Sequence, residues 1–265
     1  MRPYTLVLLH GQPGLGADWE QVIAALPDHV EVIAPDRPGH GSSTTPGGGL
    51  DINAAAVIDE LDERGIDRAV LVGHSYGGGV ALRVAATAQE RVDGLVLLAS
   101  VGPGCLNVVD WVLAAPVVGA LCSVFAWKLT PWIARAVLRL GARNHARQVR
   151  PRLHAYWYAW GCTFWLHGQL WRTFLAEQKA LVREAGEFGR LAASVRVPSL
   201  VVADPHDMMV PFRTAAALVQ TLPDASLEVI KRAGHHLPLR APEQVAGQIA
   251  RYLESLPAAD AKPHR

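Results

Sequence analysis

Short, almost continuously apolar runs recur along the first hundred residues of the chain and again after residue 198. Such runs suit strands buried on both faces of a parallel sheet, because strands with one solvated face alternate apolar and polar positions. We expect strands at 5–10, 30–35, 68–73, 94–100, 199–204 and 227–233. Between them, the stretches 17–26, 51–64, 77–89, 212–221 and 242–256 are typical of helices. This alternation predicts an α/β fold, with a mostly parallel sheet flanked by helices and right-handed crossovers.

The segment 102–190 interrupts this rhythm with a long helical stretch that separates two core strands. It holds seven of the eight tryptophans, and its eleven Lys and Arg against four Asp and Glu give it a net charge of +7. The rest of the chain then carries −6. We therefore expect a helical cap at 102–190, a core formed by 1–101 and 191–257, and a flexible polar tail at 258–265.

Composition narrows the class of protein. A chain of 265 residues can bury the core of one large α/β domain with an insertion. Its 25 Lys and Arg nearly balance 24 Asp and Glu, so no basic excess favours a nucleic-acid partner. Cys105, Cys122 and Cys162 form no C-x-x-C pair, which argues against a disulfide framework or a zinc site. The N-terminal apolar run breaks at His10, too early for a secretory signal, so we expect a cytoplasmic protein.

The stretch LVGHSYGGG contains the pentapeptide Gly73-His74-Ser75-Tyr76-Gly77, a G-x-S-x-G pattern between an expected strand and an expected helix. A sharp strand-to-helix turn would hold the Ser75 hydroxyl clear of the sheet as a nucleophile, with glycines removing the Cβ atoms that would collide. The N–H of Tyr76, at the helix N-terminus, would then face developing negative charge. The alternative is a glycine-rich turn with an incidental serine.

A serine nucleophile needs a histidine to take its proton and a carboxylate to orient that histidine. Asp207 follows the expected strand 199–204, and His235 follows the expected strand 227–233. The order Ser75, Asp207, His235 along the chain is the nucleophile–acid–histidine order typical of folds that carry the nucleophile on a strand-to-helix turn. Each assignment has a neighbouring rival, Asp204 for the acid and His236 for the base.

Taken together, LLHGQPG, APDRPGHGSS, VGHSYGGG, DPHDMMVP and AGHHLPLRAPE resemble the motifs of α/β-hydrolase-fold enzymes of the serine-hydrolase, esterase- and lipase-like branch. The resemblance covers 5–101 and 197–256, whereas the cap is similar only in position. In that family the acid precedes x-x-V-P and the histidine lies seven residues before Pro-Glu, which favours Asp207 and His235 over their rivals. Family members usually carry additional strands before the His-Gly strand. Here that strand begins near Tyr4, so we expect a smaller sheet.

The resemblance also assigns an oxyanion loop to the residues after the first strand. In the family, the backbone N–H of the residue following His-Gly is the second oxyanion donor, and here that residue is Gln12. Its side chain would contact substrate, face solvent or brace the loop. We expect His10 and His74 to pack and hydrogen-bond near the site, and Asp36 to brace a loop.

These features favour a serine hydrolase that cleaves a carboxylic ester, or related acyl bond, of an apolar small-molecule or lipid-like substrate through an acyl-enzyme intermediate. Carbon–carbon bond hydrolysis, perhydrolysis, thioester cleavage and acyl transfer can use the same triad. Epoxide and haloalkane hydrolysis are disfavoured, since those relatives carry a carboxylate where this chain has Ser75. A non-catalytic ligand-binding protein on the same scaffold is the alternative from another class. The glycine pattern matches no phosphate-binding loop, and no cofactor or metal is implied.

The cap carries a further pattern whose function is open. Arg135, Arg139, Arg143 and Arg147 recur every four residues and would share one face of a helix. The uncharged run 112–127 before them is shorter than the roughly 20 residues that a membrane-spanning helix needs. Either the arginines are solvated above a cap that covers the site, or the basic, Trp-rich cap rests peripherally on an anionic membrane surface.

Overall fold

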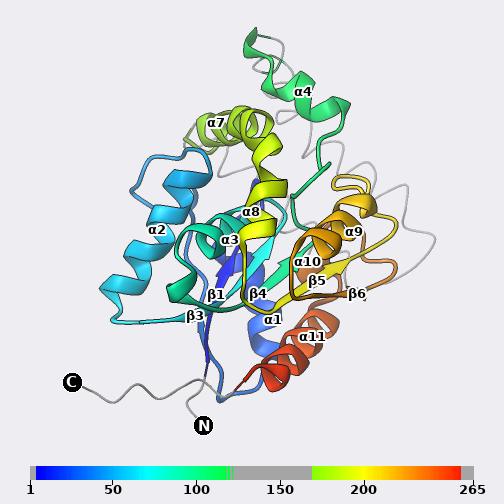
Figure 1. Ribbon diagram of the computed structural model, residues 1–265. Helices are drawn as coiled ribbons and strands as arrows, with labels where there is room; N and C mark the ends of the chain where they lie inside the picture. The colour runs from blue at the N-terminus through cyan, green and yellow to red at the C-terminus, as the bar shows by residue number, and fades with distance from the viewer. Residues whose placement is uncertain (1–3, 118, 120, 122–168, 258–265) are drawn as a thin grey trace, which may run out of the picture.

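The computed structural model describes residues 4–117, 119, 121 and 169–257 (Figure 1). Among them six strands form one sheet in which every neighbouring pair is parallel. The order across the sheet is β2-β1-β3-β4-β5-β6. The strands are β1 (Thr5–Leu9), β2 (Glu31–Ile33), β3 (Ala69–His74), β4 (Val92–Leu98), β5 (Ser199–Ala203) and β6 (Ala225–Val229). The predicted α/β fold with a parallel sheet is confirmed.

Helices cover both faces of this sheet. One face packs against α2 (Leu50–Glu63), α3 (Tyr76–Thr87), α8 (Phe188–Ser194) and α9 (Phe212–Thr221). The other packs against the 3₁₀ turn η1 (Gly16–Trp19), α1 (Glu20–Ala25), α10 (Leu237–Arg240) and α11 (Pro242–Ser255). Two further helices, α4 (Val108–Ala114) and α7 (Gln169–Glu184), contact each other beyond the sheet, at the top of Figure 1. Short 3₁₀ turns occur at η2 (Gln89–Arg91) and η4 (Ala185–Glu187).

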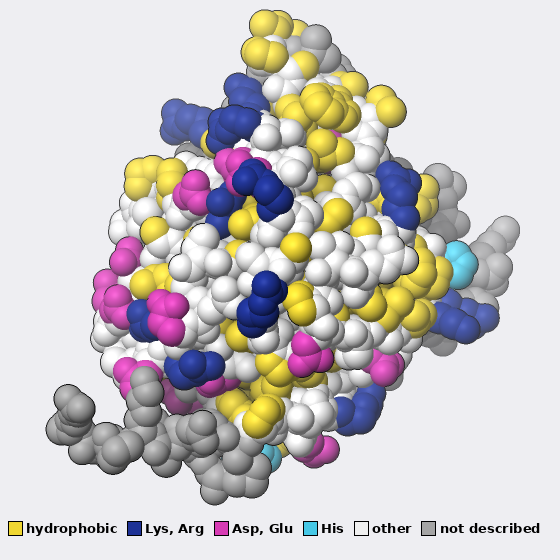
Figure 2. All heavy atoms as spheres, viewed as in Figure 1, with side chains coloured by type: hydrophobic (Ala, Val, Ile, Leu, Met, Phe, Trp, Pro, Cys, Tyr) yellow, Lys and Arg dark blue, Asp and Glu magenta, His cyan; other side chains and the backbone are white. Residues whose placement is uncertain are grey.

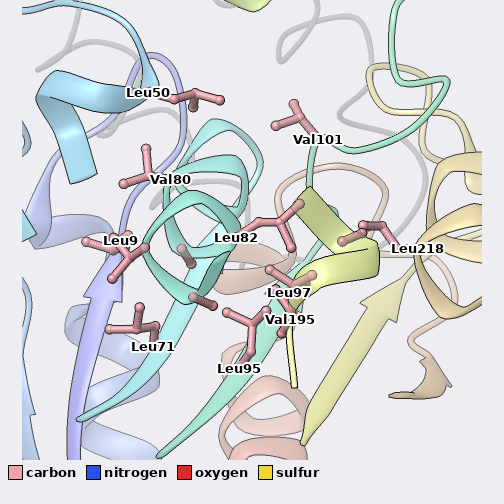
Figure 3. Packing of buried hydrophobic residues seen from close by; sticks show 14 of the residues in the cluster. Leu9, Leu50, Leu71, Val80, Leu82, Leu95, Leu97, Val101, Val195 and Leu218 are labelled. Atoms are coloured by element: carbon pink, nitrogen blue, oxygen red, sulfur yellow. The ribbon is translucent and has the colours of Figure 1, made fainter. Parts of the chain in front are cut away.

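The central strands are buried on both faces, which explains why their sequences do not alternate. Every residue of β1 and of β3 is buried. Successive side chains of a strand point to opposite faces, so each central strand contributes to both hydrophobic cores. Figure 3 shows the core around α3, which joins Leu9, Leu71, Leu95 and Leu97 of the strands to Val80 and Leu82 of the helix.

The last strand lies earlier in the sequence than predicted. The apolar run indicated 227–233, but the strand is Ala225–Val229. Ile230 and Ala233 are buried, yet they belong to the loop after the strand and pack into the core shared with α10 and α11. Because β6 is an edge strand with largely exposed residues, its burial pattern does not mark its start.

The cap boundary that we expect at residue 190 falls inside α8. Phe188 and Ala192 of this helix are fully buried in the core around α3. Residues on both sides of 190 therefore pack against the sheet domain.

Ser75 sits on the turn between β3 and α3, in a backbone conformation that few residues adopt. Its φ is 54° and its ψ is −120°, a strained combination for a side chain with a Cβ atom. Its N–H donates to the carbonyl of Leu98 at 3.0 Å, and its own carbonyl accepts from the N–H of Val101 at 3.2 Å. The end of β4 therefore holds this turn from both sides of the strained residue.

Two glycines let the turn pack this closely. A Cβ on Gly73 would lie 2.4 Å from the carbonyl oxygen of Gly77, and a Cβ on Gly77 would lie 2.2 Å from that of Leu9. Both neighbours are backbone atoms, which cannot move aside as a side chain would. The G-x-S-x-G spacing is thus a steric requirement of the turn.

Gly77→Ala should therefore destabilise the fold by about 1–3 kcal/mol or more, the cost of forcing a methyl group into a filled space. The matched control is Gly189→Ala, also in a helix, where an added Cβ meets no atom within 4 Å. That change should be neutral or stabilise by about 0.5 kcal/mol, because alanine loses less backbone entropy than glycine in a helix. Urea unfolding of both variants measures the difference. Equal stabilities would contradict this steric account of the turn.

Candidate active site

The loops that follow β3, β5 and β6 meet at the carboxyl edge of the sheet, where open α/β sheets bind their ligands. Ser75 follows β3, Asp207 follows β5 and His235 follows β6. The parallel topology therefore brings together three side chains that are up to 160 residues apart in the sequence.

These three side chains form one hydrogen-bonded chain. Ser75 Oγ lies 2.9 Å from His235 Nε2, and His235 Nδ1 lies 2.8 Å from Asp207 Oδ2. When Nδ1–H donates to the carboxylate, Nε2 remains an acceptor for the serine hydroxyl. Asp207 Oδ1 accepts from the backbone N–H groups of Met209 and Val210, at 2.8 and 2.9 Å. The carboxylate side chain is only 2% exposed, so water competes little for these bonds.

The rival acid, Asp204, holds the histidine loop instead. Its Oδ2 accepts from the backbone N–H groups of Ala233 and Gly234 at 2.7 and 2.6 Å, and Oδ1 accepts from the N–H of His206 at 2.9 Å. Burial acts to raise the pKa of Asp204, but these N–H donors outweigh it, and the pKa lies below its ordinary value. A charged carboxylate therefore fixes the backbone directly before His235.

Two further histidines lie against His235 and stay neutral. The Nε2–H of His74 donates to the backbone carbonyl of His235 at 2.8 Å, as the expectation of a packing and hydrogen-bonding role requires. Burial, followed by the nearby His235, lowers the pKa of His74 well below its ordinary value. Burial, followed by His235 and Arg240, lowers the pKa of His236 to about 4. Of the three histidines, His235 bonds to Ser75.

The two expected oxyanion donors border the serine. Tyr76 is the first residue of α3, so its N–H has no partner within the helix. Gln12 follows Gly11, and a Cβ on Gly11 would lie 3.1 Å from Ser75 Cβ, so this loop passes directly beside the serine. The backbone of Gln12 and that of Tyr76 therefore approach Ser75 from two different elements.

The side chain of Gln12 braces the loop. Its Nε2 donates to the carbonyl of Phe174 at 2.9 Å and to Gln178 Oε1 at 3.4 Å, both on α7. Gln178 Nε2 in turn donates to Asp110 Oδ1 of α4 at 2.9 Å. Hydrogen bonds thus run from the loop after β1 through α7 to α4, and the loop-bracing interpretation of this amide is confirmed.

Sequence reasoning missed Arg37 and Glu177, which form a fully buried ion pair beneath this loop. Arg37 lies in the APDRPGHG stretch, in which only Asp36 was assigned a role, that of bracing a loop. Asp36 does brace a loop, accepting from the N–H of Gly16 and of Ser42, each at 2.8 Å. Glu177 lies on α7, where a carboxylate in a helix is typical of an exposed face. Only the fold shows that this helix face is buried against the arginine.

A cavity of about 210 Å³ opens beside Ser75. Its described lining is mainly apolar and includes Pro13, Trp19, Leu113, Phe174, Met209, Pro238 and Leu239. The polar residues of the described lining are His10, Gln12, Asp18, His74, Ser75, His235 and His236. The described part of the lining contains neither arginine nor lysine.

Several expectations fall on residues outside the described ranges. These are the stripe Arg135, Arg139, Arg143 and Arg147, most of the cap tryptophans, Cys122, Cys162 and the tail 258–265. Among the described residues, no helix is long and apolar enough to cross a membrane. Within the same ranges, no cluster of His, Cys, Asp and Glu could hold a metal ion.

Comparisons with known proteins agree with the observed fold. A 2-hydroxymuconate semialdehyde hydrolase from Pseudomonas sp. (strain CF600) is 28% identical, over 97% of this chain and 89% of that protein. A thermophilic esterase from Thermogutta terrifontis superposes with a TM-score of 0.74 at 23% identity, covering 95% of this chain and 89% of the other. An enzyme that degrades N-acyl homoserine lactones superposes with a TM-score of 0.72 at 24% identity, covering 94% of this chain and 93% of the other. The family model described as the alpha/beta hydrolase family matches residues 6–248, and the chain therefore belongs to this family of hydrolases.

Proposed function

We propose that the protein is a serine hydrolase that cleaves carboxylic esters of small apolar substrates through an acyl-enzyme intermediate. The observation that carries this proposal is the continuous hydrogen-bonded chain from Ser75 through His235 to Asp207 at the wall of an apolar cavity. A hydroxyl bonded to a base, with that base oriented by a third group, is the arrangement that activates a weak nucleophile.

In this mechanism Ser75 Oγ attacks the acyl carbon while His235 Nε2 takes the hydroxyl proton. The N–H groups of Gln12 and Tyr76 stabilise the oxyanion of the tetrahedral intermediate. His235 then gives its proton to the departing alkoxide, and a water activated by the same nitrogen releases the acid. The Asp207 carboxylate orients His235 and stabilises the imidazolium that forms in both steps.

The cavity supports a small, neutral substrate. Its volume of about 210 Å³ lies below the 300–1,000 Å³ range of sites that hold drug-sized ligands. Leu113 of α4 and Met209 line it. Other apolar side chains of α4 are exposed, among them Val108, Val109 and Trp111. Figure 2 shows hydrophobic side chains gathered at the end of the molecule where α4 lies in Figure 1. Such a surface favours the approach of apolar molecules from solvent.

Carbon–carbon bond hydrolysis is the second candidate, because a relative matched along nearly the whole chain hydrolyses 2-hydroxymuconate semialdehyde. A muconate carries a carboxylate. Asp18 belongs to the described lining, and its acidic side chain disfavours an anionic substrate, which favours the neutral ester.

A substrate panel on the purified protein separates the two candidates. Aryl esters of graded acyl length should be hydrolysed with a kcat/KM at least about tenfold above that for a vinylogous diketone carboxylate, a difference of about 1.4 kcal/mol in transition-state binding. Activity on the esters should fall once the acyl chain outgrows the cavity. Ser75→Ala serves as the blank for both arms. Faster turnover of the vinylogous diketone carboxylate than of the esters would contradict the ester proposal and favour carbon–carbon bond hydrolysis. If neither substrate were turned over, both candidates would be contradicted.

The two aspartates near His235 give opposite predictions. Asp207→Asn should lower kcat by about 10³–10⁴-fold, since the amide can no longer hold the imidazole with Nε2 free to accept a proton. Asp204→Asn should instead lower the free energy of unfolding by about 1–3 kcal/mol, because buried backbone donors lose a charged acceptor. Ester kinetics and urea unfolding on both variants measure the two effects. If Asp204→Asn abolishes turnover while Asp207→Asn keeps it, the assignment of the acid is wrong.

A further inference from the structure

We propose that Arg37 and Glu177 are a positioning pair that fixes and polarises the peptide unit between Gly11 and Gln12, and that α7 is thereby coupled to the oxyanion hole. This inference rests on the proposed function, in which the N–H of Gln12 belongs to that peptide and binds the oxyanion. Neither residue contacts the reacting atoms.

The guanidinium of Arg37 engages two consecutive carbonyls of the oxyanion loop. Its Nε donates to the carbonyl of His10 at 2.9 Å, and its Nη2 donates to the carbonyl of Gly11 at 2.9 Å. Nη1 donates to Asn53 Oδ1 at 2.7 Å and also to Glu177 Oε1. Because all three nitrogens of the planar guanidinium donate hydrogen bonds, the group is held in one orientation. It therefore fixes the carbonyls of His10 and Gly11 together.

The Gly11 carbonyl and the Gln12 N–H belong to one trans peptide, in which the two bonds point in opposite directions. Arg37 is 2% exposed and does not belong to the described lining of the cavity, whereas Gly11 and Gln12 do. Holding the carbonyl toward the buried guanidinium therefore turns the N–H toward the cavity and Ser75.

His10 strengthens the same restraint. Its Nδ1 also bonds the Gly11 carbonyl, at 2.9 Å, while its Nε2 accepts from the backbone N–H of Arg37 at 3.0 Å. Burial, followed by the charge of Arg37, lowers the pKa of His10 well below its ordinary value, so the ring is neutral. The carbonyl thus accepts two bonds, one of them from a cation. Hydrogen bonds to a carbonyl polarise the whole peptide and make its N–H a stronger donor.

Glu177 is what allows a guanidinium to lie behind the loop. Both side chains are at most 1% exposed, and a buried charge without a partner is strongly destabilising. Burial raises the pKa of Glu177 above its ordinary value, although the charge of Arg37 acts to lower it. Glu177 belongs to α7, whose Phe174 carbonyl and Gln178 side chain also hold the Gln12 amide. Helix α7 therefore holds the Gln12 side chain directly and, through Glu177 and Arg37, also holds the peptide that carries the Gln12 N–H.

The competing explanation is that the pair merely docks α7 onto the core. Glu184 provides the matched control, because it is a second largely buried carboxylate on the same helix. Its Oε2 accepts from the backbone N–H of Leu50 at 3.1 Å, at the start of α2 and away from the oxyanion loop. Loss of this contact should affect stability alone.

The experiment compares Arg37→Lys, Glu177→Gln and Glu184→Gln in the full chain, on an aryl ester and on a trifluoromethyl ketone that forms a hemiketal oxyanion on the serine. Arg37→Lys retains the charge opposite Glu177 but loses the fork. Both pair variants should lower kcat by about 10–100-fold, part of the 10²–10³-fold cost of losing one oxyanion donor. KM should stay within about threefold, and the inhibition constant of the ketone should rise as kcat/KM falls. Glu184→Gln should retain the kcat of the unaltered enzyme while lowering the unfolding midpoint.

The inference is overturned if folded Arg37→Lys and Glu177→Gln keep the kcat and the ketone affinity of Glu184→Gln. It is also overturned if their losses appear in KM alone. Failure of the proposed function is distinguishable, because the unaltered protein would then neither hydrolyse the ester nor bind the ketone covalently.

Nuclear magnetic resonance of the unaltered protein keeps the test independent of whether the variants fold. The carbonyl carbon of Gly11 should resonate downfield of that of Gly186, an exposed-turn glycine outside this network, as expected for a carbonyl that accepts two hydrogen bonds. A Gly11 carbonyl shift typical of a carbonyl bonded to water would contradict the proposal.

Discussion

Ser75 can keep its strained backbone only because two neighbouring segments, the end of β4 and the loop after β1, pack around it. The end of β4 holds its N–H and its carbonyl, and the loop after β1 packs against its Cβ through Gly11. Strain of this kind costs of the order of 1–3 kcal/mol and persists only when its surroundings over-determine it. The gain is that the hydroxyl projects from the sheet toward a histidine on another loop.

The same close packing explains why polar residues lie beneath the site. A loop pressed against the serine has carbonyls that face inward, and buried carbonyls require donors. Arg37 satisfies those of His10 and Gly11, and Glu177 balances its charge. The histidine loop meets the same requirement from the other side, where Asp204 accepts its backbone N–H groups. Reactive groups are thus held at the surface of the core by charges buried one layer below them.

Much of this could be predicted from the sequence, because the motifs that mark the site are local. The apolar runs located five strands to within about two residues at their ends. The G-x-S-x-G pattern located Ser75, and the resemblance to the hydrolase motifs selected Asp207 and His235 over their neighbours. The sixth strand was misplaced because an edge strand is largely exposed, whereas the loop after it contributes Ile230 to the core. Arg37 and Glu177 lie 140 residues apart, and no spacing rule connects a loop arginine to a helix carboxylate. Tertiary contacts of this kind appear only once the fold is known.

The central claim is that Ser75 is an activated nucleophile, and covalent labelling tests it most directly. A fluorophosphonate reacts with a serine whose proton is taken by a neighbouring base. Peptide mass spectrometry of the labelled protein should place one phosphonyl group on Ser75, and His235→Ala should abolish the reaction. An unlabelled wild-type protein, or a label that persists in Ser75→Ala, would contradict the account and indicate a hydrolase scaffold that binds ligands without this chemistry.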